Sequence, residues 1–203
     1  MNKATDFTRE EVLEIVHKLK NANLSGIDLH GTNLRGANLY EADLNKANLN
    51  GADLSQAILR GANLRGAIFR GGALCSANLS GADLSEAILN GVDLSEARLY
   101  NAILHKAKLS EANLRRTQLS GADLSHSILN MGYLFEANMI NTNLENAQLI
   151  KANLRAANLT GADLSDANLT GAELNYAMYS KLTTFPEGFN PELAGMVMVE
   201  VGV

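Results

Sequence analysis

Large apolar residues recur at every fifth position along most of this chain. They begin at Leu24 and continue without a slip to Tyr179, which gives 32 quintets over residues 22–181. Twenty-nine of these central residues are Leu, and the exceptions are Phe69, Met139 and Tyr179. Such regularity indicates one small structural unit repeated many times.

The residues around each centre are also restricted. The position two before the centre is Ala in 24 quintets, and the position between them is Asp or Asn in 19. The position two after the centre is Gly in 12 quintets. We call these three the inward, outward and corner positions.

A period of five fits neither a simple helix nor a simple strand. On a helix, five residues rotate about 140° beyond one turn, so the centres would spiral around every face. On a continuous strand, an odd period would place successive centres on opposite faces. The pattern instead predicts a short extended piece followed by a turn, in which a corner Gly supplies the positive φ of a type II turn. A chain that turns the same way after each quintet winds into a coil with its centres inside.

The quintets themselves resemble a known family. Residues 52–56 (ADLSQ) and 162–166 (ADLSD) are similar to the A(D/N)LXX signature of pentapeptide-repeat proteins, and the resemblance covers 160 of 203 residues. It implies an all-β solenoid, the right-handed quadrilateral β-helix, with four quintets per coil and about eight coils. Residues twenty apart would then stack, and the rod would be about 38 Å long.

Both ends of the repeat carry segments that we expect to cover the open coils, which divides the chain into 1–21, 22–181 and 182–203. Thr8 and Glu11 form a capping-box pattern before apolar residues at helical spacing, so we predict a helix over residues 9–20. Asn190 followed by Pro191 predicts a second helix start. The residues expected to cover the last coil are Leu182, Phe185, Phe189, Leu193 and Met196.

The C-terminal tail carries two further signals. Alternating valines predict a strand that packs on the cap or pairs with a second molecule, and they are Val197, Val199, Val201 and Val203. Residues 184–191 resemble the tails that follow the repeats in cyanobacterial members of the family.

Composition narrows the classes of function. The net charge of −5 and the pI near 5.4 disfavour a direct nucleic-acid binder. No signal peptide and no run of 18 apolar residues is visible, so we expect a cytoplasmic protein without a membrane segment. The single cysteine, Cys75, excludes an internal disulfide.

Catalytic chemistry is not expected. Of the four histidines, only His105 and His126 fall on one side in adjacent coils, and no carboxylate completes a metal triad with them. The carboxylates lie on a convex rod, where no pocket shifts their pKa values toward catalysis. We therefore predict no enzymatic activity, no metal and no cofactor.

Two surfaces are candidates for binding. The first is an acidic face on the side of Leu24, where Asp alternates with Asn along the coils, and its residues are Asp43, Asp83, Asp123 and Asp163. This alternation also has a structural interpretation, because it keeps like charges from stacking. The second is an apolar patch that begins on the side of Leu29 and consists of Ile68, Ile88, Ile128, Met131, Tyr133, Phe135 and Ile150. Outward clusters of this kind are typical of contact surfaces.

Two functions remain open. One is a scaffold that binds an unidentified protein or a second copy of itself. The other is a DNA mimic that binds a type II topoisomerase (gyrase), as some bacterial pentapeptide-repeat proteins do. Duplex DNA of this length carries about 22 negative charges. Residues 22–181 carry 15 acidic and 13 basic side chains, a net of −2, which favours the scaffold.

Overall fold

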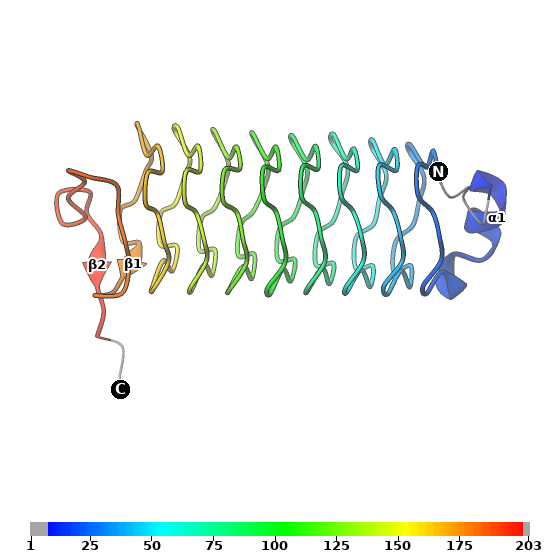
Figure 1. The fold of residues 1–203 in the computed structure, drawn as a ribbon, viewed down its shortest axis with the longest axis horizontal. Coiled ribbons are helices and arrows are strands. Elements are labelled where there is room, and N and C mark those ends of the chain that lie inside the picture. The colour runs from blue at the N-terminus through cyan, green and yellow to red at the C-terminus, as the bar shows by residue number, and fades with distance from the viewer. Residues whose placement is uncertain (1–7, 201–203) are drawn as a thin grey trace.

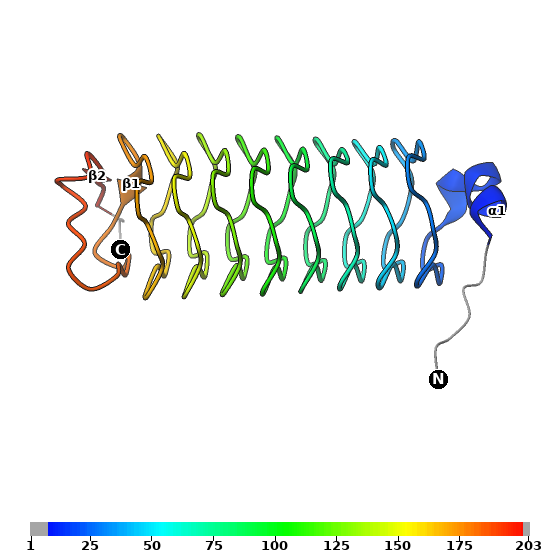
Figure 2. The same cartoon turned by 90° about the horizontal axis from the view of Figure 1, so that it is seen from above.

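Parallel β-bridges between residues twenty positions apart define the architecture of this protein. The computed structural model describes residues 8–200 and shows a stack of similar coils along one axis (Figures 1 and 2). The bridges run from Asn23–Asp43 to Asn158–Met178 and join outward positions of successive coils. Four quintets therefore make one coil. We number its sides first to fourth by the centres Leu24, Leu29, Leu34 and Leu39.

The backbone of each quintet pairs with the coils before and after it. On the first side, the N–H of Leu44 donates to the carbonyl of Asn63 at 2.7 Å, and the N–H of Asp43 donates to the carbonyl of Ala22 at 2.9 Å. Within the quintet, the N–H of Ala47 donates to the carbonyl of Leu44 and closes the turn. Repetition of this pattern makes the coil a rigid frame for outward side chains.

Every corner from Gly26 to Tyr176 has positive φ, whether or not it is glycine. Twelve of these corners are Gly and nineteen are other residues, such as Lys46 with φ of 56°. The prediction that corner glycines supply a positive φ is correct, but the coil imposes that conformation everywhere. A non-glycine residue in this conformation costs about 1–2 kcal/mol. The packing of the coils therefore offsets that cost at each of the nineteen corners without glycine.

The core is a column of centres with small inward residues between them. All but one of the 32 centres are buried. Leu169 is the exception to the predicted burial, and it is partly exposed because no further coil covers it on the second side. Four buried hydroxyls at inward positions donate to backbone carbonyls, and they belong to Thr32, Thr117, Ser127 and Thr142.

The outward Asp and Asn residues are mostly half-buried, which corrects the expectation that they would be largely exposed. In all nineteen, Oδ1 accepts the backbone N–H of the residue two positions later. Asn63 also donates its side-chain amide to Asp43 Oδ1 at 2.9 Å. These bonds hold the side chains flat against the coil.

The N-terminal end is covered by α1, Arg9–Glu14, and by a short 3-10 helix, Val16–Lys18. The predicted capping box is present: Glu11 N–H donates to Thr8 Oγ1, and Thr8 N–H donates to Glu11 Oε2 at 2.7 Å. The α-helix is shorter than the predicted 9–20, because Ile15 leaves helical conformation at φ −115°.

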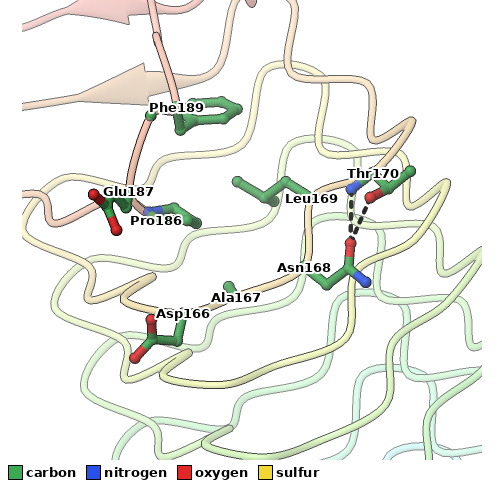
Figure 3. Close-up of a pocket in the computed structure, with 9 residues that line it drawn as sticks. Asp166, Ala167, Asn168, Leu169, Thr170, Pro186, Glu187 and Phe189 are labelled. Carbon is green, nitrogen blue, oxygen red and sulfur yellow. Dashed lines mark hydrogen bonds between the residues drawn. The ribbon is translucent and has the colours of Figure 1, made fainter.

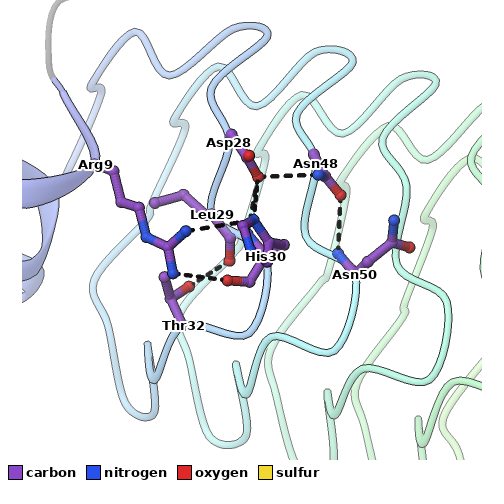
Figure 4. Close-up of polar contacts among 7 residues, drawn as sticks. All are labelled: Arg9, Asp28, Leu29, His30, Thr32, Asn48 and Asn50. Carbon is purple, nitrogen blue, oxygen red and sulfur yellow. Dashed lines mark hydrogen bonds and ion pairs between the residues drawn. The ribbon is translucent and has the colours of Figure 1, made fainter.

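Two contacts fix α1 on the first coil. Val12 is fully buried in the core. The Arg9 guanidinium donates to the carbonyl of His30 at 2.9 Å, as Figure 4 shows.

The C-terminal strand pairs with its own chain. Strand β1, Met178–Tyr179, lies parallel to β2, Val197–Met198. Because β1 belongs to the last quintet of the repeat, Val197 pairs with the coil itself, which differs from both alternatives for the valine-rich tail, and Val201 and Val203 lie outside the described residues.

The segment between β1 and β2 covers the last coil only in part. Phe185 and Phe189 stack at 5.1 Å and are half-buried, and Met196 is buried. Leu182 and Leu193 are 71% and 88% exposed, so the prediction that they cover the coil is wrong.

The predicted second helix is also absent from the described residues. Asn190 Oδ1 accepts the N–H groups of Glu192 and Leu193, as an N-cap does. The following residues form only a turn, which ends at Gly195 with φ of 73°.

Candidate interaction surfaces

The apolar patch divides into two parts in the structure. Ile68 and Ile88 are bridged neighbours on the second side, and Lys108 separates them from Ile128. All three isoleucines are half-buried. The first part, Ile68 and Ile88, therefore offers less apolar area than the sequence suggests.

The second part of the patch is more exposed. Met131 is 49% exposed and Tyr133 is 51% exposed. Met131 donates its backbone N–H to the carbonyl of Ile150 at 2.9 Å, which places these residues in adjacent coils. Phe135 is half-buried, and the Arg115 guanidinium lies over its ring at 5.5 Å. Ile128, Met131, Tyr133 and Ile150 thus lie around the corner between the second and third sides, and Phe135 lies at the next corner, between the third and fourth sides.

The acidic face is already engaged in local hydrogen bonds. Asp43, Asp83, Asp123 and Asp163 each accept the backbone N–H two residues later, and all four are half-buried. Ile103, which is 42% exposed, interrupts the column between Asp83 and Asp123. Nearby, Arg65 pairs with Glu86 at 2.5 Å. The face is therefore a weak anionic surface.

The first two coils hold a small polar cluster beside α1 (Figure 4). His30 Nδ1 lies 2.8 Å from Asp28 Oδ1, and Asn48 donates its amide to the same oxygen at 2.9 Å. The hydrogen bonds from His30 hold the pKa of Asp28 below its ordinary value. Both His30 and Asp28 are exposed, so the cluster ties coils together rather than forming a pocket.

The remaining nucleophilic and metal-binding candidates have structural partners. His105 Nδ1 lies 2.8 Å from Ser125 Oγ, and its ring meets that of His126 edge-on at 5.4 Å. Cys75 is half-buried and its thiol donates to Ser55 Oγ. Among residues 8–200, leaving aside the side chain of His17, no three metal-binding side chains converge.

Sequence reasoning missed one groove and several exposed apolar residues, including Tyr176, which is 68% exposed. Ile58, Tyr100 and Ile103 are each about two-fifths exposed. Ile58 and Ile103 stand at outward positions that usually hold Asp or Asn, and this signal was present in the repeat. A groove at the C-terminal end, between the last coil and residues 186–189, had no such signal because the path of the tail creates it (Figure 3).

Comparisons with known proteins agree with the repeat. The family model for pentapeptide repeats matches eight copies, at residues 18–51, 47–74, 77–116, 117–155 and 147–178. A search of curated proteins gave no match. No described helix has the length and apolar character needed to cross a membrane.

Solved structures that are similar to this chain include HetL, Rfr23 and full-length QnrB1. HetL, a pentapeptide-repeat protein involved in heterocyst differentiation regulation from the cyanobacterium Nostoc sp. strain PCC 7120, is 30% identical over 89% of this chain and 96% of its own, with a TM-score of 0.35. Rfr23 from the cyanobacterium Cyanothece 51142 is 33% identical over 56% of this chain and 63% of its own, with a TM-score of 0.28. Full-length QnrB1, a plasmid-mediated fluoroquinolone resistance protein, is 16% identical over 88% and 94%, with a TM-score of 0.34.

Proposed function

Because the chain belongs to the pentapeptide-repeat family, whose members fold as right-handed quadrilateral β-helices, we propose that it is a non-enzymatic scaffold that binds another protein. The proposal includes about eight coils, covered by α1 at one end and in part by the segment after Tyr179 at the other. It also includes a cytoplasmic location and no cofactor. The observation that carries it is the exposed second part of the apolar patch.

The chemistry of this surface suits a protein partner. Met131 and Tyr133 expose about half of their surface, and Arg115 lies at the edge over Phe135. Tyr, Phe, Met and Arg are enriched in protein interfaces. Pairing with both neighbouring coils already fixes the backbone of these residues, so binding has to order only their side chains.

The test replaces the patch residues with those that the repeat uses in the same columns. Glu111 occupies the same corner as Met131 in the preceding coil, and Asn113 occupies the same outward position as Tyr133 in that coil. A Met131→Glu, Tyr133→Asn variant therefore fits the coil. Its thermal unfolding should match that of the wild type, and it should lose the association that the wild-type protein shows.

Affinity capture from the native host, together with sedimentation velocity, would measure that association. Ile58→Asn is the matched control, because Ile58 is similarly exposed at 43% and stands on the fourth side between Asn38 and Asn78. If the Met131→Glu, Tyr133→Asn variant and the Ile58→Asn control both keep the partner and the oligomeric state of the wild type, the patch is not the binding surface.

The second candidate function is a DNA mimic that binds gyrase. The acidic face favours it, since the first side has a net charge of −4. That net charge is far below the about 22 negative charges of duplex DNA of the same length. The aspartates of the face are also half-buried, and Ile103 interrupts their column. A supercoiling assay tests this candidate. If micromolar protein neither inhibits nor protects gyrase, the DNA-mimic function is excluded.

A further inference from the structure

The last coil has an open edge on its second and third sides. In the coil before it, the N–H groups of Asn146, Leu149, Lys151 and Leu154 each donate to a carbonyl of the following coil. One coil later, the corresponding groups have no hydrogen-bond acceptor among the described residues, and they belong to Asp166, Leu169, Gly171 and Leu174. The carbonyls of Ala167 and Ala172 likewise accept no hydrogen bond. The tail after Tyr179 pairs with the first and fourth sides only, through Thr184 and β2.

A groove runs along this edge. It has a volume of about 540 Å³ and is lined by the stretch from Asp166 to Thr170 and by residues 186–189. Leu169, the one partly exposed centre, extends across it toward Pro186 and Phe189 (Figure 3). In the coils below, each centre is covered by the centre twenty residues later, so the groove has room for one more apolar side chain.

The charge at the groove has one sign. Asp166 and Glu187 line it, both are exposed, and no lysine or arginine is among the lining residues. Asp166 precedes Leu169 by three positions. If the apolar residue of a parallel strand lies over Leu169, the residue three positions before it in that strand therefore lies over the Asp166 carboxylate. A basic residue there would be attracted.

We propose that this edge binds a peptide segment of another protein, which pairs in parallel with Asp166–Leu174, follows the turn at Thr170 and Gly171, and inserts one large aliphatic side chain over Leu169. The segment carries a lysine or arginine three residues before that aliphatic residue and a small residue two before it. Parallel addition follows because every bridge in the coils is parallel. Strand addition of this kind takes affinity from main-chain hydrogen bonds and specificity from alternate side chains.

The probe is a synthetic fluorescent peptide with the sequence of residues 151–160 (KANLRAANLT), which has this pattern. Titration into the full chain, followed by fluorescence anisotropy, should give saturable binding with one site per chain. Methylating the backbone nitrogen of its first Asn should weaken binding at least about tenfold, because that N–H pairs with the carbonyl of Ala167 in the proposed register. Methylating the nitrogen of its first Leu should have little effect, because the N–H of each centre points toward the following coil and so away from this edge.

Protein variants test the groove itself. Leu169→Asp and the double variant Asp166→Lys, Glu187→Lys should each weaken binding at least about tenfold, and replacing the first lysine of the peptide with glutamate should restore binding to the double variant. Leu193→Asp is the control, since Leu193 is 88% exposed in the same segment and does not line the groove. The comparison of the methylated peptides uses the wild-type protein. The test therefore remains valid even if Leu169→Asp fails to fold.

Hydrogen exchange gives an independent readout. The amides of Leu169, Gly171 and Leu174 should become protected when the peptide binds. Absence of saturable binding, equal binding of both methylated peptides, or dimerisation of the chain through this edge that the peptide does not displace would each overturn the proposal.

Discussion

At the residue scale, the outward Asp and Asn act mainly on their own backbone. Asp83 Oδ1 accepts the N–H of Ser85 at 2.8 Å, and equivalent bonds occur at every Asp or Asn in this position. A short side chain with an oxygen at the δ position is needed to reach that N–H. This explains why Asp and Asn interchange freely there and why their frequency carries little information about a ligand.

Gly72 tests how tightly the inward positions are packed. A Cβ at Gly72 would lie 3.0 Å from the Phe69 ring and 3.0 Å from the carbonyl oxygen of Ala52. Gly72→Ala should therefore lower the free energy of unfolding by about 1–3 kcal/mol in urea denaturation. Adding Phe69→Leu should recover part of that loss. Equal stability of Gly72→Ala and the wild type would contradict the close contact.

Ala156 tests the cost of a corner without glycine. Its φ is 56°, where glycine is strain-free, so Ala156→Gly should raise the unfolding free energy by about 0.5–1 kcal/mol in urea denaturation. Ala157→Gly, at the buried inward position next to it, should instead destabilise by about 1 kcal/mol. If both changes had the same sign, the corner would not be strained.

At the element scale, the short helix α1 depends on its cap and on one buried side chain. A helix of six residues is unstable alone, so the capping box of Thr8 and the burial of Val12 must hold it. The sequence showed both features. It did not show that the helix would stop at Glu14, because residues up to Leu19 continue the apolar spacing while the first coil forces the chain to turn.

Loss of the cap should loosen this end alone. Thr8→Ala removes the acceptor for Glu11 N–H and should destabilise α1 by about 1 kcal/mol. Hydrogen exchange should then show faster exchange at Val12 and Ile15, with no change at Leu89. Faster exchange throughout the coils would mean that α1 is not a separate unit.

Acid should have a related effect on α1. Hydrogen bonds from the backbone and hydroxyl of Thr8 lower the pKa of Glu11 below its ordinary value of 4.5. A lowered pKa in the folded state means that the ionised form stabilises the fold, so this contribution is complete above about pH 4.5 and is lost as the pH falls further. Glu11→Gln should remove this pH dependence of exchange at Val12.

At the scale of the whole molecule, each coil contacts only its neighbours, so stability varies along the rod. Interior coils are paired on both faces, as at Leu89, which donates to Lys108 while Ile88 donates to Ala67. The last coil is paired on both faces only on its first and fourth sides. The unpaired edge is thus both a weak point of the fold and the proposed peptide site.

Native-state hydrogen exchange of the free protein should display this gradient. The amides of Leu169 and Leu174 should exchange at least about tenfold faster than those of Leu89 and Leu94, since the first two have no acceptor among the described residues. Uniform protection along the rod would show that something covers the edge in solution.

The amino-acid sequence by itself determined the register of this protein. A period of five with a small residue, a polar residue and Leu in fixed order specifies which side chains lie inside. The stacking of residues twenty apart followed from the resemblance to the family, and the parallel bridges confirm it. It also identified the capping box at Thr8. These features are local or strictly repeated, so a short stretch of sequence contains all the information they require.

The tertiary structure decided what the repeat does not encode. Exposure of the outward aspartates depended on which backbone N–H each oxygen could reach. The partly exposed Leu169 and its groove arose because the tail crosses two sides of the last coil and not the other two. A non-repeating segment follows the packing of its own side chains, and only the assembled coil supplies the surface that directs it.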